Sequence, residues 1–158
     1  MLVDTHSLSV SILSPRDRVI ARIRNVAIGS NGAADVHFRG DETTPRGTYR
    51  IAWIDRHSRF GLFFGLNYPT PAVAARAYLE GRIGRASLDA IVEAFREHRI
   101  APQDTPLGGE LGIHGLGAGA PPWIQRSVNW TDGCVALAPA QMREFSRWAH
   151  VGTRVVIR

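Results

Sequence analysis

The single cysteine of the sequence, Cys134, is the residue best suited to nucleophilic chemistry. A thiol of ordinary pKa, about 8.5, is mostly protonated at neutral pH, so a reactive cysteine needs a base or a positive charge beside it. His114 is the candidate base, because it ends a predicted short strand upstream and is followed by Gly115, which leaves room for a substrate. Gly133 permits close approach of the backbone before the cysteine, and the amides of residues 130–133 can face an oxyanion. We therefore expect Cys134 to be the nucleophile and His114 to accept its proton.

The alternative for a lone cysteine is a small buried hydrophobic residue. That alternative predicts that Cys134 is buried far from His114, whereas catalysis requires both at one cavity. One cysteine cannot form an internal disulfide, and the Cys/His clusters of structural zinc sites are absent from the sequence. The other histidines show no metal-ligand spacing with acidic residues: His6, His37, His57, His98 and His150. We expect neither a metal nor a cofactor.

The composition restricts the partners of the chain. Every basic residue is arginine, and the net charge of +5 favours anionic ligands. The arginines are scattered, and no zinc-finger spacing or aromatic RNA-binding signature accompanies them, so we do not expect a nucleic-acid binder. The weaker alternative, an arginine-rich nucleic-acid binder, predicts salt-sensitive binding that is indifferent to the thiol. We expect no transmembrane segment, because the apolar stretches are far shorter than a bilayer requires, and no signal peptide at the amino terminus.

Strands dominate the first third of the expected fold. Apolar and polar residues alternate over 7–12 and 18–24, which predicts half-buried strands, and Tyr49, Ile51 and Trp53 are expected on one face of a strand over 48–54. Further short strands are expected at 134–137 and 153–157.

Three helices are expected among these strands. Thr70 and Pro71 mark the start of the first, which Gly81 can end, and Ser87 is the expected N-cap of the second. The second helix is expected to turn its apolar stripe inward, and the third to begin near Pro139 with a similar stripe. The residues of the two stripes are Leu88, Ile91, Val92 and Phe95, then Met142, Phe145 and Trp148. The sequence thus predicts one α+β domain over residues 1–158, mainly β, with a curved sheet or sandwich and two or three packed helices.

Several segments, read together, resemble the YkuD-type L,D-transpeptidases. Ile113-His114-Gly115 followed by residues 130–137, Trp-Thr-Asp-Gly-Cys-Val-Ala-Leu, resembles the active-site signature of that family. Residues 40–51, with their acidic pair, Thr-Pro and Gly-Thr-Tyr, are similar to another family segment. The YafK-like branch is the most similar, on three further segments: Ser58-Arg59-Phe60, Leu66-Asn67-Tyr68-Pro69 and Thr105-Pro106-Leu107-Gly108-Gly109. The resemblance covers residues 8–158.

The resemblance implies an enzyme of the bacterial cell wall. Cys134 would attack a carbonyl of a peptidoglycan stem tetrapeptide, with loss of its terminal D-amino acid, and His114 would accept and return the proton. The carbonyl of Gly115 would orient His114, and the amides around Gly133 and Cys134 would hold the oxyanion. Peptidoglycan lies outside the cytoplasmic membrane, so the resemblance also implies the periplasm or cell envelope. It implies no cofactor, and the acceptor would be an amine or water.

Five residues are expected to contact the substrate. Tyr68 belongs to a matching segment, and Trp130, Thr131 and Asp132 precede the nucleophile. Arg126 lies between His114 and Cys134, where it can bind a stem carboxylate or remain a solvated loop residue. The aromatic residues can instead serve packing alone.

The sequence also departs from the family pattern. Asp132 stands where many relatives have a second histidine, and Ala136 where many have arginine. Asp132 can stabilise a protonated His114 or cap a turn. Transpeptidation is the first hypothesis, and hydrolysis as a carboxypeptidase, amidase or endopeptidase is the alternative. A wall-binding module without catalysis is the alternative of another class.

Overall fold

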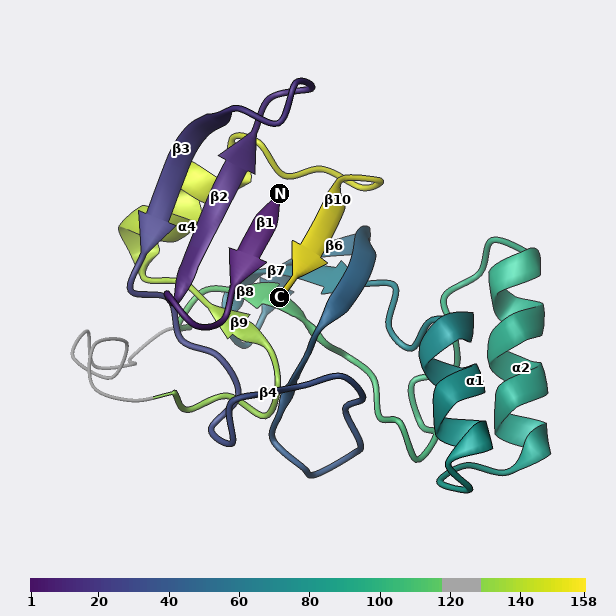
Figure 1. The fold of residues 1–158 in the computed structure, drawn as a ribbon. Helices are drawn as coiled ribbons and strands as arrows, with labels where there is room; N and C mark the ends of the chain where they lie inside the picture. The colour runs from purple at the N-terminus through teal and green to yellow at the C-terminus, as the bar shows by residue number, and fades with distance from the viewer. Residues whose placement is uncertain (118–128) are drawn as a thin grey trace.

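The computed structural model describes residues 1–117 and 129–158. In this part of the chain most elements are strands, and helices lie beside and behind them (Figure 1). The strands are β1 (Leu2–Asp4), β2 (Ser9–Leu13), β3 (Val19–Arg24), β4 (Ala33–Ala34), β5 (Thr44–Pro45), β6 (Gly47–Ser58), β7 (Gly61–Leu66), β8 (Gly112–His114), β9 (Val135–Ala136) and β10 (Arg154–Ile157). The helices are α1 (Pro71–Leu79), α2 (Arg85–Arg96) and α4 (Pro139–Ser146). The predicted α+β class, mainly β with two or three helices, is confirmed.

Eight of the strands form one mixed sheet in the order β3-β2-β1-β10-β6-β7-β8-β9. The first and last strands, β1 and β10, are parallel neighbours in its middle (Figure 1). At one edge β8 and β9 are also parallel, with His114 opposite Ala136. This pairing joins the two segments that carry the expected catalytic residues. The short strands β4 and β5 pair separately.

One face of the sheet builds the core through the expected alternation. Tyr49 and Ile51 of β6 are each 1% exposed, and Val155 of β10 is fully buried beside them. Trp53 does not continue this row, because the register between β6 and β7 shifts between Ile51 and Trp53. It lines a pocket instead. The prediction that Trp53 shares the core face is therefore wrong.

Helix α1 begins as its sequence predicts. The side chain of Thr70 accepts a hydrogen bond from the amide of Val73, and Pro71 occupies the first turn. The predicted N-cap of the next helix is wrong, because α2 already begins at Arg85, with Gly84 as its N-cap, and Ser87 lies inside the first turn. Among the described residues, no helix is long and apolar enough to cross a membrane.

The apolar stripes of α2 and α4 are only partly turned inward. Ile91 of α2 is fully buried, whereas Phe95 is 42% exposed. Met142 and Phe145 of α4 are buried as expected. Trp148 is not, because α4 ends at Ser146 and the Trp148 indole donates to the Glu144 carboxylate at the surface over 3.1 Å. The inward orientation predicted for Phe95 and Trp148 is therefore wrong.

Candidate active site

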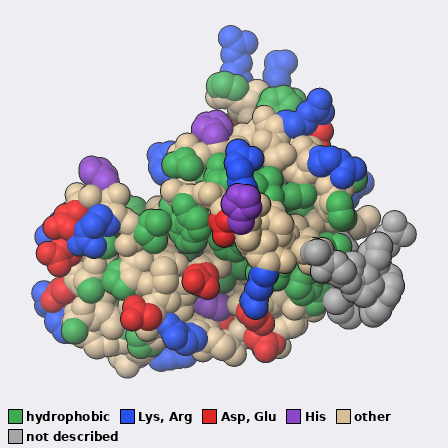
Figure 2. All heavy atoms as spheres, turned by 180° about the vertical axis from the view of Figure 1, so that it is seen from behind, with side chains coloured by type: hydrophobic (Ala, Val, Ile, Leu, Met, Phe, Trp, Pro, Cys, Tyr) green, Lys and Arg blue, Asp and Glu red, His purple; other side chains and the backbone are tan. Residues whose placement is uncertain are grey.

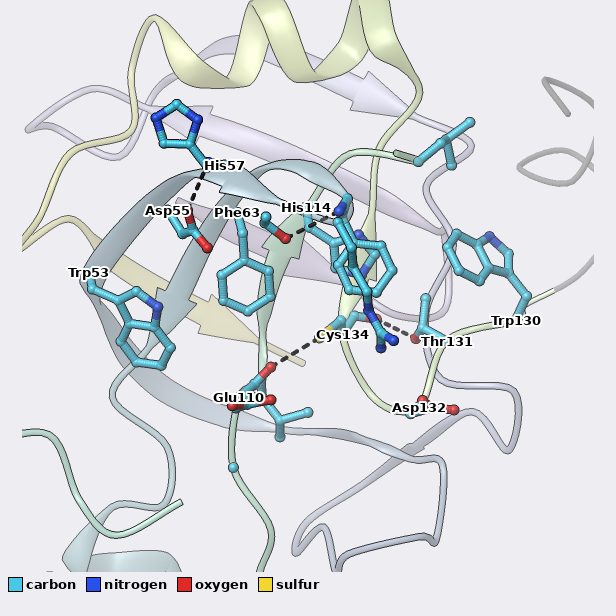
Figure 3. A pocket seen from close by; sticks show the side chains of 16 residues that line it. Trp53, Asp55, His57, Phe63, Glu110, His114, Trp130, Thr131, Asp132 and Cys134 are labelled. Atoms are coloured by element: carbon cyan, nitrogen blue, oxygen red, sulfur yellow. Dashed lines mark hydrogen bonds between the residues drawn. The ribbon is translucent and has the colours of Figure 1, made fainter. Parts of the chain in front are cut away.

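A pocket of about 990 Å³ contains both Cys134 and His114. Its walls come from the β6–β7 hairpin, the segment before β8, β8 itself and the loop before β9 (Figure 3). It is lined by Trp53, Asp55, His57, Ser58, Arg59, Phe60, Phe63, Gly109, Glu110, Leu111, His114, Leu116, Trp130, Thr131, Asp132 and Cys134. The alternative that places Cys134 far from His114 is thereby excluded.

The imidazole of His114 is held on several sides. Its Nδ1 lies 2.6 Å from the carbonyl oxygen of Gly115, which can only accept, so Nδ1 carries the proton and Nε2 is left free to accept one. The ring stacks on Phe60 at 4.0 Å between centroids, and on Phe63, which lies opposite it across β7 and β8. Burial among these rings lowers the pKa of His114. The imidazole is therefore neutral at neutral pH.

The thiol of Cys134 is partly exposed and bonded to the backbone of the segment that leads into β8. The amide of Gly112 donates to Sγ over 3.3 Å, and the thiol donates to the carbonyl of Glu110 over 3.5 Å (Figure 3). His114 lies two residues beyond Gly112 on β8, so residues 112 and 114 face the same side of the sheet. Among the described residues, no hydrogen bond joins the thiol directly to the imidazole.

Electrostatics keep the resting thiol protonated. Desolvation raises the pKa of Cys134 to about 12, and the carboxylates of Asp132 and Glu110 act in the same direction. Both partners are therefore uncharged, and this site does not store a thiolate–imidazolium pair. For such a thiol to react, its proton must pass to a base, and His114 Nε2 is a nitrogen of the same pocket that can accept it.

The protonated thiol predicts slow alkylation. At neutral pH iodoacetamide is expected to modify Cys134 about a hundredfold more slowly than a free cysteine, after allowing for the greater nucleophilicity of a thiolate of higher pKa. The rate is measured by intact mass, with guanidinium-unfolded protein as the control for full reactivity. Fast alkylation that levels off below neutral pH would show a preformed ion pair instead.

Two buried threonine hydroxyls hold the loop that carries Cys134. Thr131 Oγ1 donates to the carbonyl of Cys134 and accepts a hydrogen bond from the Gly133 amide over 3.3 Å. Thr44 Oγ1 donates to the carbonyl of Gly133 over 2.8 Å and accepts from the Gly29 amide. The Gly133 amide is thus already engaged, which leaves the amide of Cys134 as the better candidate for an oxyanion donor.

The residues expected to contact the substrate have different outcomes. Trp130, Thr131 and Asp132 line the pocket with Cys134 and His114. Tyr68 does not reach it: the side chain is fully buried, and its hydroxyl donates to the carbonyl of His37 over 2.6 Å. The structure therefore gives Tyr68 a packing role in place of the expected substrate contact. Arg126 lies outside the described residues.

The sequence motifs do not predict most of the residues that form the pocket wall. Glu110, whose carbonyl accepts from the thiol, was not singled out, nor were Asp55 and Phe63. Arg59 and Phe60 belong to a segment that resembles the family, and that resemblance is the only sequence feature that points to their place in the pocket. In the structure the Arg59 guanidinium lies over the Phe60 ring, which in turn stacks on His114. The Phe60 ring thus lies between the exposed Arg59 guanidinium and the His114 imidazole.

The fold and the site together define a mainly β protein with a thiol and an imidazole at one end of a mixed sheet. A family model described as the YkuD L,D-transpeptidase catalytic domain matches residues 1–157. The chain therefore belongs to the YkuD family. A comparison with curated proteins gave no match.

Solved structures of low sequence identity share this fold. The helical cell shape determining protein Pgp2 from Campylobacter jejuni is 17% identical, with a TM-score of 0.65 over 99% of this chain and 46% of that one. Bd1075 from Bdellovibrio bacteriovorus is 18% identical, with a TM-score of 0.55 over 99% and 46%. An L,D-transpeptidase from Xylanimonas cellulosilytica is 16% identical, with a TM-score of 0.54 over 99% and 58%. The chain thus spans about half the length of these proteins.

Proposed function

We propose that the chain is a cysteine acyl-transfer enzyme that acts on peptidoglycan stem peptides. The observation that carries this proposal is the pocket shared by the Cys134 thiol and a His114 whose Nδ1 is bonded to Gly115. Membership of the YkuD family supports the substrate class. Such substrates lie outside the cytoplasmic membrane, so the periplasm or cell envelope is the proposed place of action.

The proposed reaction begins with the attack of Cys134 Sγ on a stem-peptide carbonyl while the thiol proton passes to His114 Nε2. The tetrahedral oxyanion is stabilised by an amide donor, for which the Cys134 N–H is the candidate. Collapse of this intermediate breaks the peptide bond, and protonated His114 gives its proton to the departing amine. A thioester on Cys134 remains, and an amine or water then attacks it with His114 again as the base.

The nature of the second attack separates the possible activities. An amine acceptor gives transpeptidation, and water gives carboxypeptidase, amidase or endopeptidase action. The carboxylates of Glu110 and Asp132 in the pocket attract a cationic amine, and this favours the amine acceptor. Trp130, Thr131 and Asp132 remain the proposed substrate contacts, and Arg126 stays a proposed one.

The test is intact-mass spectrometry after incubation with a disaccharide-tetrapeptide, with and without an amine acceptor. We expect an adduct on the wild type whose mass corresponds to the donor minus its terminal D-residue, and no adduct on Cys134→Ala. Released products then distinguish a new cross-link from a shortened tripeptide. Because Ala is close in volume to Cys, the thermal midpoint of the variant serves as the folding control.

Absence of both adduct and turnover in the folded wild type would contradict the proposal. The wall-binding alternative predicts that outcome together with cosedimentation on purified peptidoglycan that Cys134→Ala leaves unchanged. A carbapenem gives a second covalent probe, since a module without catalysis forms no adduct with it.

A further inference from the structure

The face of the sheet opposite the core is strongly basic. The register places Arg22 and Arg24 of β3 opposite Ser11 and Ser9 of β2, and β1 and β10 continue the same face as far as β6. Residues that pair across strands share a face, so this outer face is defined by the following residues. They are Arg22, Arg24, Ser9, Ser11, Leu2, Asp4, Val156, Arg154, Thr48 and Arg50. The alternate residues of these strands, such as Val10, Ile23 and Val155, are buried in the core.

The arginines of the outer face have almost no acidic partners. Asp4 is its only carboxylate in these strands, and it pairs with Arg158 at 3.4 Å. None of the ion pairs within residues 1–117 and 129–158 involves Arg22, Arg24, Arg50 or Arg154. All four are exposed. The outer face therefore presents uncompensated positive charge.

Two of these arginines repel each other directly. Arg154 of β10 lies opposite Arg50 of β6 in the antiparallel register. Like charges at directly opposed positions destabilise a sheet. Arg50 donates to the carbonyl of Gly152, which holds its side chain without neutralising it. A bound anion would relieve this repulsion, which the fold itself leaves in place.

The positive charge is spread over a surface instead of following a line. β3 and β6 are four strand spacings apart in the sheet order, or about 19 Å. At one side the β2–β3 hairpin projects from the molecule, and basic side chains are seen there in Figure 2. The turn of this hairpin carries Arg16, Asp17 and Arg18, and Val19 and Ile20, each 51% exposed, follow at the start of β3. The basic surface thus borders an exposed apolar pair, Val19 and Ile20, beside the turn.

A broad basic surface bordered by an exposed apolar pair fits a bilayer better than it fits a nucleic acid. Single-stranded nucleic acids are bound through aromatic side chains on which bases stack, and the outer face has none. The major groove of a duplex admits a helix or a two-stranded ribbon, whereas these five strands spread their charge over a surface about 19 Å wide. An anionic bilayer accepts many arginines at once and takes up exposed apolar side chains at its interface. We propose that the outer face docks on anionic phospholipid, with the tip of the β2–β3 hairpin entering the headgroup region.

Vesicle cosedimentation tests this proposal. The protein is expected to bind vesicles that mix phosphatidylglycerol with phosphatidylcholine, and to leave vesicles of phosphatidylcholine alone in the supernatant. Each arginine near an anionic surface contributes about fivefold to partitioning, so Arg22→Gln/Arg24→Gln is expected to bind about thirtyfold more weakly. Arg154→Gln is expected to lose about fivefold while its thermal midpoint stays level or rises, because the repulsion with Arg50 is removed.

The matched control removes the same charge elsewhere. Arg85→Gln/Arg96→Gln lies on α2, away from the outer face, and should bind as the wild type does. Equal loss in this control, or equal binding to both kinds of vesicle, would overturn the proposal. Displacement from the vesicles by duplex DNA at equal phosphate concentration would instead assign the face to nucleic acid. Cys134→Ala should bind vesicles normally, so the result does not depend on the proposed catalysis.

Discussion

Replacement of His114 by glutamine is expected to lower the rate of acyl-enzyme formation about a thousandfold. The neutral imidazole shares its pocket with a thiol whose pKa is about 12, and general base catalysis contributes on the order of 10²–10⁴ in rate. Glutamine can keep a donor toward the Gly115 carbonyl but has no basic nitrogen. The time course of the adduct mass after rapid mixing with the tetrapeptide donor measures this loss.

The matched control for this substitution is His150→Gln, an exposed histidine between α4 and β10. Its acylation rate should stay within about twofold of the wild type. Thermal melts of both variants separate lost chemistry from lost folding. A folded His114→Gln variant that acylates at the wild-type rate would remove His114 from the mechanism.

The pH profile follows from the same residue. Burial lowers the pKa of His114 below its ordinary value of 6.5, so the basic form persists to lower pH than in an exposed histidine. The rate of acylation should therefore begin to decline at a lower pH than an unshifted imidazole would give. A decline that begins above pH 7 would mean that His114 titrates as an exposed or negatively paired imidazole.

The second large effect is expected for Gly133→Ala, which combines two costs. Gly133 has φ +123°, a conformation that side chains rarely adopt, and a Cβ there would lie 2.7 Å from the carbonyl oxygen of Thr43. Strain of this kind costs about 1–3 kcal/mol, and the backbone clash adds to it. We expect the free energy of unfolding to fall by about 3 kcal/mol or more in denaturant titration.

Gly152→Ala is the control for Gly133→Ala. Gly152 has φ +91°, but a Cβ there meets no atom within 4 Å, so this variant carries the conformational cost alone. It should be destabilised by about 1 kcal/mol and should keep its acylation rate. Gly133→Ala should also acylate slowly even at temperatures where it is folded, because the clash displaces the residue before the nucleophile. Equal stability of the two variants would contradict the close approach to Thr43.

The sequence predicted the chemical pair but not the cavity around it. His114 and Cys134 could be predicted because both lie at the ends of short strands within recognisable segments. The pairing of β8 with β9 then brings these segments together. The places of Glu110 and Phe63 in the pocket could not be predicted from the sequence. Their place depends on long-range pairing of β7 with β8, which sets Phe63 opposite His114 and which no local pattern encodes.

Local rules failed where tertiary contacts decide the outcome. Serine is a good N-cap, yet α2 starts at Gly84, and Ser87 becomes part of its first turn. The Tyr68 segment resembles the family, but a resemblance gives position along the chain and not exposure. Tyr68 is buried between Tyr49 and His37, so its match reflects packing in this structure. The central place of β1 beside β10 likewise follows from contacts between the two ends of the chain.

The protonated resting state of Cys134 also bears on how the protein survives oxidants. Peroxide oxidises thiolates through sulfenic to sulfinic and sulfonic acids, and it attacks a neutral thiol far more slowly. With no second cysteine in the sequence, a sulfenic acid on Cys134 has no resolving partner in its own chain. Holding the proton on sulfur thus slows the oxidation of the one thiol in the sequence, at the expense of intrinsic reactivity.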